Sequence, residues 1–313
     1  MSEPVRPLLI VGIAQRSGTH LLQDLLCLHP GCVPAVSTRT PWGSGWEDHL
    51  VYFGDRLYEY RARLVANWEG QGVEAESLRT ALDSSLAEWA AAFLERLPAD
   101  GHGRRTVTKS TSAERLDVLA PWLLTDVDVV VLVRDPRAVL ESARLTFGDS
   151  FERRLRAYVR SAQSILAYRR DAPGALIVRY EDLLTDRRGE VKRVLGSLGL
   201  DTETYDFEAA ARLPIRGSPS AREHDGRWWE LPWNSSFDGD RRADQLPARL
   251  RTRVEWVAGA EMSAFGYEVR PSFSRPDRVH LAGRDAAYRA ARRASQLVTS
   301  LRAAGPRAGS QLH

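Results

Sequence analysis

A turn containing glycine, serine and one arginine joins an apolar run to an amphipathic segment near the N-terminus. It lies in PLLIVGIAQRSGTHLL (residues 7–22), where Gly12 and Gly18 flank Arg16 and Ser17. In a strand–turn–helix of this kind, backbone N–H groups point into one concavity and the positive end of the helix dipole adds to them. Thr19 adds a hydroxyl donor and Arg16 adds a charge. The turn therefore predicts a binding site for a phosphate-like anion.

This turn departs from the P-loop motif of nucleoside triphosphatases, G-x-x-x-x-G-K-[ST]. Five residues separate Gly12 from Gly18, and no lysine follows Gly18. Enzymes of that class hold Mg²⁺ partly through an acidic residue at the end of a second strand. Here the long apolar run VDVVVLV (127–133) is followed by Arg134, which is a cation. The residues favour a dense anion bound without a metal ion, and we expect no metal ligands.

A second element, RDPRAVLES, begins at Arg134. Asp135 suits a helix N-cap, and Pro136 suits the first helical position. Ser142 then lies nearly two turns into the helix, so Arg134 and Ser142 can grip one phosphate with a forked guanidinium and a hydroxyl. Lys109 ends a third apolar stretch, TVTK, and would share the same edge of a parallel sheet with Arg16 and Arg134. The alternative is a capped turn with ordinary surface arginines.

Short apolar runs alternate with helical patterns along much of the chain. We predict buried parallel strands over 7–13, 106–109, 127–133 and 175–178, because each is a short, mostly β-branched run. Helical patterns follow them over 21–29, 112–124, 136–145, and 181–184 continued by 190–199. This alternation predicts an α/β fold, with a P-loop-like parallel sheet flanked by helices on both faces.

Two stretches fall outside this alternation. Residues 31–104 begin with a loop rich in Gly and aromatic residues and continue with helical patterns at 55–69 and 77–97. We interpret them as a mostly helical and loop insertion that covers the sheet edge and forms the acceptor side. Residues 213–245 read as an irregular segment with three tryptophans, and we expect the last helix of the domain at 247–265.

The predicted organisation is one domain over residues 1–270 and an Arg- and Ala-rich helical tail over 271–313. The net charge is +3, but residues 270–313 hold nine Arg and two Asp, so they contribute +7 and leave −4 for the rest. We therefore expect no nucleic-acid-binding face on the domain. A thin apolar stripe in the tail predicts a helix that packs on the domain or on a partner such as a second copy. Membrane-surface binding is the less favoured alternative.

The chain carries few signals of export or of a membrane. No stretch approaches the roughly 20 apolar residues of a membrane-spanning helix, and the segment MSEPVRP lacks the apolar region of a secretory signal. Cys27 and Cys32 are the two cysteines, which excludes a disulfide scaffold and favours a reducing, cytoplasmic environment. Cys27, His29 and Cys32 make a poor zinc pattern because no second ligand pair occurs elsewhere.

Three motifs together resemble the sulfotransferases that use 3′-phosphoadenosine 5′-phosphosulfate (PAPS). The family's strand followed by [RK]-S-G-T-T-L-L binds the 5′-phosphosulfate, and its R-[DN]-P-R-x-x-x-x-S element binds the 3′-phosphate. Its R-Y-E-D-L element places a tyrosine near the adenine. The resemblance spans residues 7 to about 270, up to FGYE (265–268). It implies nucleotide-binding roles for Arg16, Ser17, Gly18, Thr19, His20, Leu21, Arg134, Ser142 and Tyr180.

One branch of that family, with bacterial small-molecule and tyrosylprotein sulfotransferases, offers two more parallels. Its lysine element near the transferred sulfate is similar to Lys109-Ser110-Thr111. Its late loop on the 3′-phosphate side is similar to Arg216-Gly217-Ser218. Two departures are that His20 replaces a second threonine and that the lysine element lacks its proline. His20 could still donate to a phosphate or reach the sulfate.

The resemblance implies in-line transfer of a sulfuryl group from PAPS to a hydroxyl of a small molecule, such as a phenol, a natural product or a glycoside. Arg16 and Lys109 would lie beside the leaving oxygen. The acceptor also needs a general base, and tyrosylprotein sulfotransferases have a Glu after the first helix. This chain has AVST there, so we predict Glu47 as the base and His49 as the second choice. A solvated loop or helix start is the alternative for both.

Two other functions remain open at this point. One is an ATP-dependent phosphotransferase of the P-loop class, which would require Mg²⁺. The other is an inactive nucleotide-binding scaffold whose basic tail binds RNA or a membrane.

Overall fold

A computed structural model of the 313-residue chain is described here for residues 5–35, 47–72, 74–96, 103–148, 150–213, 215–217, 229–231, 241–270 and 272–303. Within these ranges, the side chains of 47–55, 215–217, 229–231, 241, 292 and 295–303 are outside the description. The chain divides into two compact units, Met1–Tyr267 and Glu268–His313.

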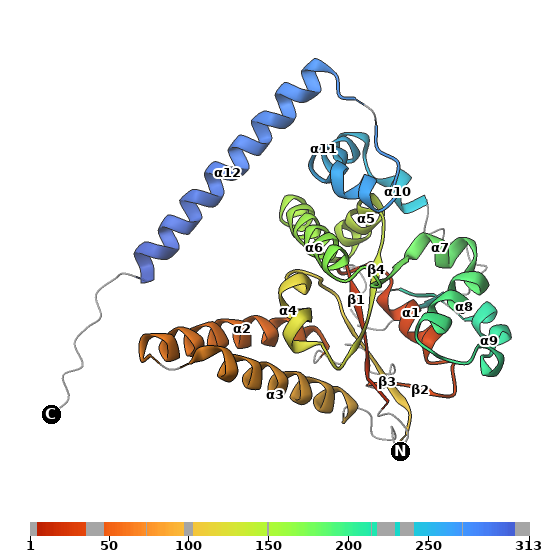
Figure 1. The fold of residues 1–313 in the computed structure, drawn as a ribbon. Helices are drawn as coiled ribbons and strands as arrows, with labels where there is room; N and C mark the ends of the chain where they lie inside the picture. The colour runs from red at the N-terminus through yellow and green to blue at the C-terminus, as the bar shows by residue number, and fades with distance from the viewer. Residues whose placement is uncertain are drawn as a thin grey trace. The chain divides into compact units, whose positions relative to one another are not determined.

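A parallel sheet forms the centre of the first unit (Figure 1). Its strands, in spatial order, are β2 (Cys32–Pro34), β3 (Arg105–Ser110), β1 (Leu8–Gly12), β4 (Asp128–Val133) and β5 (Leu176–Arg179). Leu8 lies opposite Val107 of β3 and Asp128 of β4, so the central strands run in step and end together. The predicted α/β fold with a parallel sheet is confirmed.

The expectation that residues 31–104 lie outside the sheet is wrong at one point. Cys32–Pro34 form the edge strand β2, whose Cys32 pairs with Arg105 of β3. Three residues are too few to show a strand periodicity, and a proline inside a strand is tolerated only at such an edge.

The central strands are buried on both faces, as their continuous apolar runs predict. Leu8, Leu9, Ile10 and Val11 are each at most 1% exposed. Leu8 and Ile10 belong to the core cluster that contains Leu22 and other apolar residues of α1, so one face of β1 packs against that helix.

Helices cover both faces of this sheet. On one side lie α1 (Thr19–Leu26), α7 (Tyr180–Thr185), α8 (Arg187–Ser197) and α9 (Phe207–Arg212), and on the other lie α4 (Leu116–Leu123), α5 (Pro136–Phe147), α6 (Phe151–Asp171) and α11 (Ala248–Ala264) (Figure 1). A 3₁₀ turn, η1 (Thr202–Thr204), precedes α9. The helices α1, α4, α5 and α11 agree in place with the sequence prediction, whereas α6 was not predicted.

Two predicted helices have different limits from those expected. The helix predicted from 181 to 199 is two helices, because Asp186 has a non-helical backbone (φ −135°, ψ 72°) and ends α7. Its carboxylate accepts from the N–H of Gly189 at 2.9 Å and so caps α8. The helix predicted from 112 begins only at Leu116, because Arg115 has a left-handed backbone with φ of 67°.

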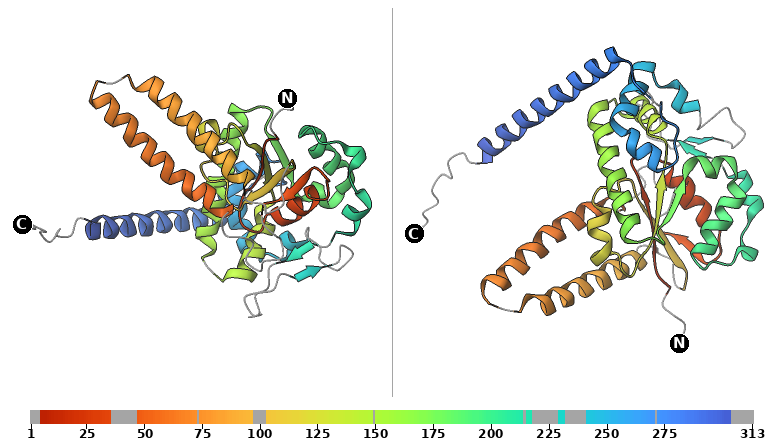
Figure 2. Two further views of the ribbon diagram at one scale, coloured as in Figure 1. Left: turned by 90° about the horizontal axis from the view of Figure 1, so that it is seen from below. Right: turned by 45° about the horizontal axis from the view of Figure 1, so that its top comes forward.

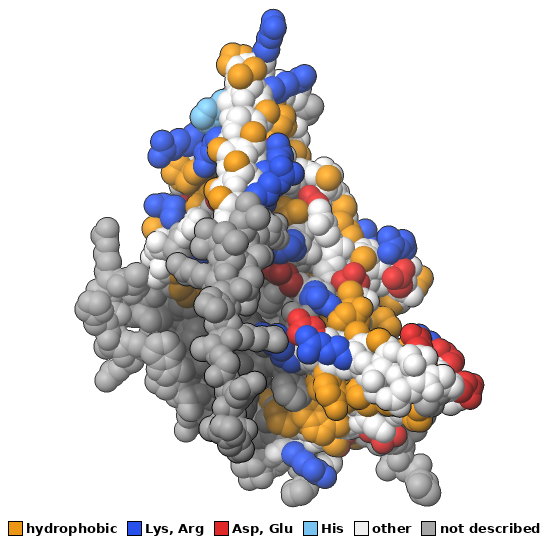
Figure 3. Space-filling view, turned by 90° about the vertical axis from the view of Figure 1, so that its left-hand side faces the viewer, with side chains coloured by type: hydrophobic (Ala, Val, Ile, Leu, Met, Phe, Trp, Pro, Cys, Tyr) orange, Lys and Arg blue, Asp and Glu red, His pale blue; other side chains and the backbone are white. Residues whose placement is uncertain are grey.

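An antiparallel hairpin, α2 (Glu47–Gly70) and α3 (Ala75–Glu95), projects from the body in both views of Figure 2. Arg61 of α2 pairs with Asp83 of α3, with Nη2 to Oδ2 at 2.6 Å, and stacks 5.5 Å from the ring centre of Trp122. These contacts join the hairpin to α4. Charged side chains of both signs lie among apolar ones on this hairpin, at the right of Figure 3.

The segment expected to be irregular, 213–245, contains some regular structure. The short strands β6 (Ile215–Gly217) and β7 (Trp229–Leu231) form an antiparallel pair, and α10 (Arg241–Gln245) follows. Helix α10 lies against α5, and β6 lies near α1.

The second unit contains one long helix, α12 (Arg275–Ala303), within the tail that the sequence predicts to be helical. Ser274 precedes it, and its hydroxyl oxygen accepts from the N–H of Asp277 at 3.2 Å, as an N-cap does. Among the helices of the described ranges, none is long and apolar enough to cross a membrane.

Candidate active site

The loop between β1 and α1 is a tight turn at the end of the central strand. Arg16 and Gly18 have positive φ values of 77° and 97°, and the Ser17 hydroxyl donates to the carbonyl of Ala14 at 2.8 Å. A Cβ on Gly12 would lie 2.6 Å from Ser17 Oγ, so only glycine fits beneath this turn. A left-handed conformation is costly for a non-glycine residue and concentrates at functional sites.

Helix α1 begins at this loop with its first N–H groups uncapped by a side chain. Gly18 is the N-cap residue, and the first turn contains no acidic residue. The positive end of the helix is therefore available to an anion. Leu21 is 3% exposed within the core, so only its backbone N–H can serve the ligand-binding role expected of it. His20 is partly exposed in the first turn.

The structure brings the second predicted element to this loop. Arg16 Nε donates to the hydroxyl oxygen of Ser142 at 2.9 Å, and Arg134 Nη1 donates to the carbonyl oxygen of Arg16 at 2.9 Å. Arg134 follows β4, and Ser142 lies on α5, so three elements meet here. The structure therefore brings Arg16, Arg134 and Ser142 together, as the sequence predicts.

Tyr180 packs against this group through its ring. The guanidinium of Arg134 lies 4.1 Å from the centre of the Tyr180 ring, and both side chains are buried. A Cβ on Gly18 would lie 2.3 Å from the same ring, so the absence of a side chain at Gly18 allows the loop to touch Tyr180. Burial raises the pKa of the Tyr180 hydroxyl, which is therefore neutral at physiological pH.

The arginines oppose one another electrostatically. Burial, with further repulsion from Arg134 and Arg242, lowers the pKa of Arg16 to about 10. Burial and the charge of Arg134 also lower the pKa of Arg242. With a pKa of about 10, the guanidinium of Arg16 is still charged at neutral pH. An anion bound between these side chains would relieve this repulsion.

Arg242 is a residue that the sequence analysis missed. It lies on α10, in the stretch expected to be irregular, and α10 packs on α5. The sequence offers only Arg-Arg before the last domain helix as a signal, and arginine is common throughout this chain. The packing of α10 identifies it, because the charge of Arg242 acts on both Arg16 and Arg134.

Lys109 is buried on β3, opposite Ile10 and one residue before the strand ends. Its side chain points to the same face as that of Val107, which belongs to the core cluster with α1. The charge of Lys109 acts on the thiol of Cys27, the C-cap residue of α1, and lowers its pKa against the larger effect of burial. The role expected of Lys109 at the leaving oxygen stays a prediction.

The side chains of the other predicted site residues lie outside the described residues. Arg216 and Gly217 are in β6, near α1, with their side chains outside the description, and Ser218 lies outside the described residues. Glu47 and His49 are in the first turn of α2, which lies against β3 and α4, and their side chains are also outside the description. Their predicted roles stay predictions.

Cys27, His29 and Cys32 take part in the packing around the end of α1. Nδ1 of His29 accepts from the N–H of Gly31 at 2.9 Å, and its Nε2 lies 3.1 Å from the carbonyl oxygen of Asp201. Both cysteines are free thiols, and burial raises the pKa of Cys32 to about 11 and that of Cys27 further. These contacts are those of a structural turn.

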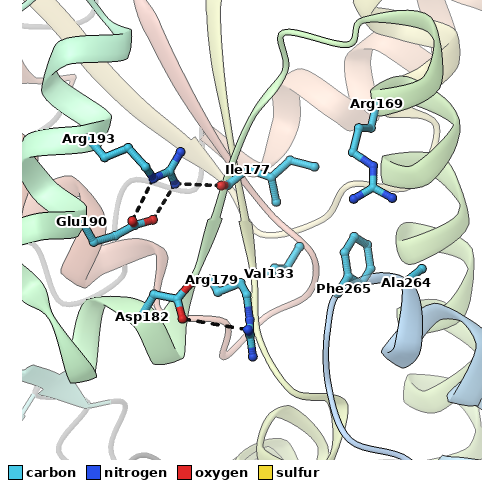
Figure 4. A pocket seen from close by; sticks show the side chains of 9 residues that line it. All are labelled: Val133, Arg169, Ile177, Arg179, Asp182, Glu190, Arg193, Ala264 and Phe265. Carbon is cyan, nitrogen blue, oxygen red and sulfur yellow. Dashed lines mark hydrogen bonds and ion pairs between the residues drawn. The ribbon is translucent and has the colours of Figure 1, made fainter.

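A cavity of about 360 Å³ lies beside the edge strand β5 (Figure 4). Arg193 is held there by Glu190, with Nε to Oε2 at 2.8 Å, and donates to the carbonyl of Ile177 at 2.9 Å. Arg179 lies 4.0 Å from Asp182. The residues lining this cavity do not include Arg16, Arg134 or Ser142, so it is separate from the loop.

The amino-acid sequence matches the model of one protein family over residues 7–204, which is more than half of the chain. The chain belongs to the sulfotransferase family. The matched residues include β1, the loop between β1 and α1 (the anion loop, residues 13–18), the Arg134–Ser142 segment and Tyr180, whereas Arg242 lies beyond them. None of the curated protein sequences compared with this sulfotransferase matches it.

Solved structures show a general likeness. The sulfotransferase domain of the Synechococcus PCC 7002 olefin synthase is 21% identical, with a TM-score of 0.44 over 91% of this chain and 96% of that one. The sulfotransferase domain of the curacin biosynthetic pathway is 17% identical, with a TM-score of 0.46 over 86% and 100%. Retinol dehydratase, crystallised with androsterone and the inactive cofactor PAP, is 19% identical, with a TM-score of 0.44 over 85% and 83%.

Proposed function

We propose that this protein transfers a sulfuryl group from PAPS to a hydroxyl group of a small molecule, without a metal ion. The observation that carries the proposal is the meeting of Arg16, Arg134 and Arg242 with the uncapped start of α1. Three mutually repelling guanidiniums fit a ligand with several negative charges at two positions. PAPS, with a 3′-phosphate and a 5′-phosphosulfate, has that charge pattern.

The two ends of the nucleotide would bind to different parts of the group. Arg16, the backbone of residues 17–21 and the Thr19 hydroxyl would hold the 5′ end, where the N–H groups of α1 begin. Arg134 and Ser142 would hold the 3′-phosphate. The Ser142 hydroxyl accepts from Arg16 Nε and has its own proton left to donate to a phosphate oxygen. Tyr180 would lie near the adenine, and Arg216, Gly217 and Ser218 on the 3′-phosphate side.

Asp135, the acidic residue nearest the end of β4, caps α5. Its use as a cap supports a site that works without Mg²⁺. Asp135 accepts from the N–H of Arg137 at 2.7 Å as the N-cap of α5, and it pairs with the Arg137 side chain at 2.6 Å. In a magnesium-dependent phosphotransferase, a carboxylate near this position coordinates the metal. The residue that begins this segment is the cation Arg134, which suits direct binding of the anion.

The chemical step needs stabilisation of the leaving oxygen and removal of the acceptor proton. Bound PAPS would supply the sulfuryl group, with adenosine 3′,5′-bisphosphate as the leaving group. Arg16 and Lys109 are proposed to stabilise the charge on the leaving oxygen, and His20 to donate from the first turn of α1. Glu47, or His49 as the second choice, would accept the proton of the acceptor hydroxyl. The contact of α2 with β3 supports this, since β3 ends at the same edge of the sheet as β1.

A turnover assay tests the proposal directly. The full chain would be incubated with PAPS, EDTA and a panel of phenols, hydroxylated natural products and glycosides, and both the sulfated product and the released bisphosphate would be measured. We expect equimolar product and bisphosphate with at least one acceptor, at a rate that EDTA does not change. Phosphorylated products formed only with ATP and Mg²⁺ would identify the protein as a phosphotransferase instead.

A further inference from the structure

Two motifs contain residues that have no role in the ligand contacts above. They are RYEDL at residues 179–183 and FGYE at 265–268, which lie more than 80 positions apart. In the structure they meet, because the hydroxyl of Tyr267 donates to Glu181 Oε2 at 2.9 Å. The other carboxylate oxygen, Oε1, accepts from the backbone N–H of Asp135 at 2.9 Å. Glu181 therefore connects the end of α11 to the residue that follows Arg134.

A helix on the other face of the sheet binds the carbonyl group of Arg134. Tyr158 of α6 donates its hydroxyl to the carbonyl oxygen of Arg134 at 2.8 Å, and the Tyr158 side chain is fully buried. This carbonyl and the N–H of Asp135 belong to one peptide group. Both polar atoms of that peptide group are thus bound by side chains, one from α6 and one from α7.

Fixing this peptide group limits where the Arg134 side chain can point. Rotation of the peptide plane would break both hydrogen bonds and leave a buried donor and a buried acceptor unsatisfied, which is costly. Tyr180, the residue before Glu181, stacks on the guanidinium itself at 4.1 Å. The first turn of α7 therefore holds Arg134 at two points: its side chain directly and its backbone through Asp135.

We propose that Tyr158, Glu181 and Tyr267 are positioning residues that fix the peptide group between Arg134 and Asp135 and thereby aim the Arg134 guanidinium at the 3′-phosphate of the nucleotide. This inference rests on the proposed function. It gives the Glu of RYEDL and the Tyr of FGYE one shared task. Neither side chain touches the nucleotide in this account.

The test compares Tyr158→Phe with a matched control, Tyr205→Phe. Tyr205 is also buried, and its hydroxyl also donates to a backbone carbonyl, that of Leu25, at 2.8 Å. Both substitutions remove one hydroxyl and leave one buried carbonyl without that hydrogen-bond donor, so their effects on thermal stability should be similar. Only Tyr158 is bound to the segment that carries Arg134.

Calorimetric titration of each folded variant measures two ligands. For adenosine 3′,5′-bisphosphate, we expect Tyr158→Phe and Tyr267→Phe to weaken binding about 5- to 20-fold, the loss expected for partial misplacement of a charge-assisted hydrogen bond. For adenosine 5′-monophosphate, which lacks the 3′-phosphate, we expect changes within about twofold. Tyr205→Phe should change neither affinity. The double variant Glu181→Gln/Tyr267→Phe should be no weaker than Glu181→Gln, because both residues act along one path.

Equal losses for both ligands, or the same small loss in Tyr158→Phe and Tyr205→Phe, would overturn the inference. If the unmodified protein binds no bisphosphate, the proposed function fails. The positioning role is then tested by NMR on the free protein. The Nε–Hε NMR signal of Arg134, assigned through its loss in Arg134→Lys, should be sharp in the unmodified protein and in Tyr205→Phe but broadened in Tyr158→Phe. An unchanged signal in Tyr158→Phe contradicts the inference.

Discussion

The side chain of Arg16 donates to the hydroxyl of Ser142 across 2.9 Å, although the two residues are 126 positions apart in the chain. This hydrogen bond joins the loop after β1 to the second turn of α5. It is reinforced by the bond from Arg134 to the carbonyl of Arg16. The loop that would bind one end of the nucleotide and the segment that would bind the other therefore form one connected structure.

Ser142→Ala should weaken the binding of adenosine 3′,5′-bisphosphate about 3- to 10-fold. The substitution removes the acceptor of Arg16 Nε and the proposed donor to the 3′-phosphate, and a hydrogen bond of this kind contributes about 1 kcal/mol. Calorimetry measures the change. Ser161→Ala, at a similarly buried serine on α6, is the control and should bind like the unmodified protein. Equal affinities in the two variants would remove Ser142 from the site.

Arg242→Ala should stabilise the free protein while weakening ligand binding. Its guanidinium is partly buried, and burial and the charge of Arg134 lower its pKa more than Glu141 and Tyr180 raise it. Without it, the melting temperature should rise by about 1–3 °C, and bisphosphate binding should fall several-fold and become less sensitive to salt. Arg249→Ala, at an exposed arginine on α11, should change neither quantity. A lower melting temperature with unchanged binding would assign Arg242 a purely structural role.

The chain has two lysines, which makes a paired test possible. Lys109→Met should lower kcat about 10²- to 10³-fold with bisphosphate affinity nearly unchanged, as removal of a group that stabilises the leaving oxygen does. Lys192 is exposed on α8, and Lys192→Met should retain full activity. Lys109 is also buried, and its charge acts on the thiol of Cys27, so thermal melting must be measured alongside. A lower melting temperature with normal kcat would show that its charge serves folding alone.

Glu47→Gln should reduce kcat by about 10²- to 10⁴-fold, the contribution of a general base, and leave the affinity for bisphosphate intact. Steady-state turnover and calorimetry give the two quantities. Glu59→Gln is the control, since Glu59 lies on the same helix α2 but is exposed and paired with Arg56 at 3.2 Å. Full activity of Glu47→Gln together with inactive His49→Gln would transfer the role of base to His49.

Much of the sheet could be predicted because its strands are buried on both faces. The runs at 7–13, 127–133 and 175–178 are apolar apart from Asp128, which is the pattern of a covered parallel strand. Helix α6 also has a readable pattern, with Leu155, Tyr158, Val159, Ala162 and Ile165 at helical spacing, all on its buried side. The edge strand β2 and the break at Asp186 are set by single residues and tertiary packing, and short sequence patterns do not report them.

The candidate site was predictable where it is local and not where it depends on folding. The anion loop and the Arg134–Ser142 segment are contiguous motifs, so residue type and spacing identify them. Arg242 and the bonds of Tyr158 and Glu181 to the Arg134–Asp135 peptide group arise only when distant elements pack together. No spacing rule within the sequence relates those residues to one another.

Calorimetric titration with adenosine 3′,5′-bisphosphate in EDTA tests the central claim most directly. We expect saturable 1:1 binding to the unmodified protein, a loss of about 10- to 100-fold in Arg134→Ala, and at least tenfold weaker binding of adenosine 5′-monophosphate. The control variant Arg170→Ala, at an exposed arginine paired with Asp171, should bind normally. No heat with the bisphosphate, or equal affinity for the two nucleotides, would contradict the account.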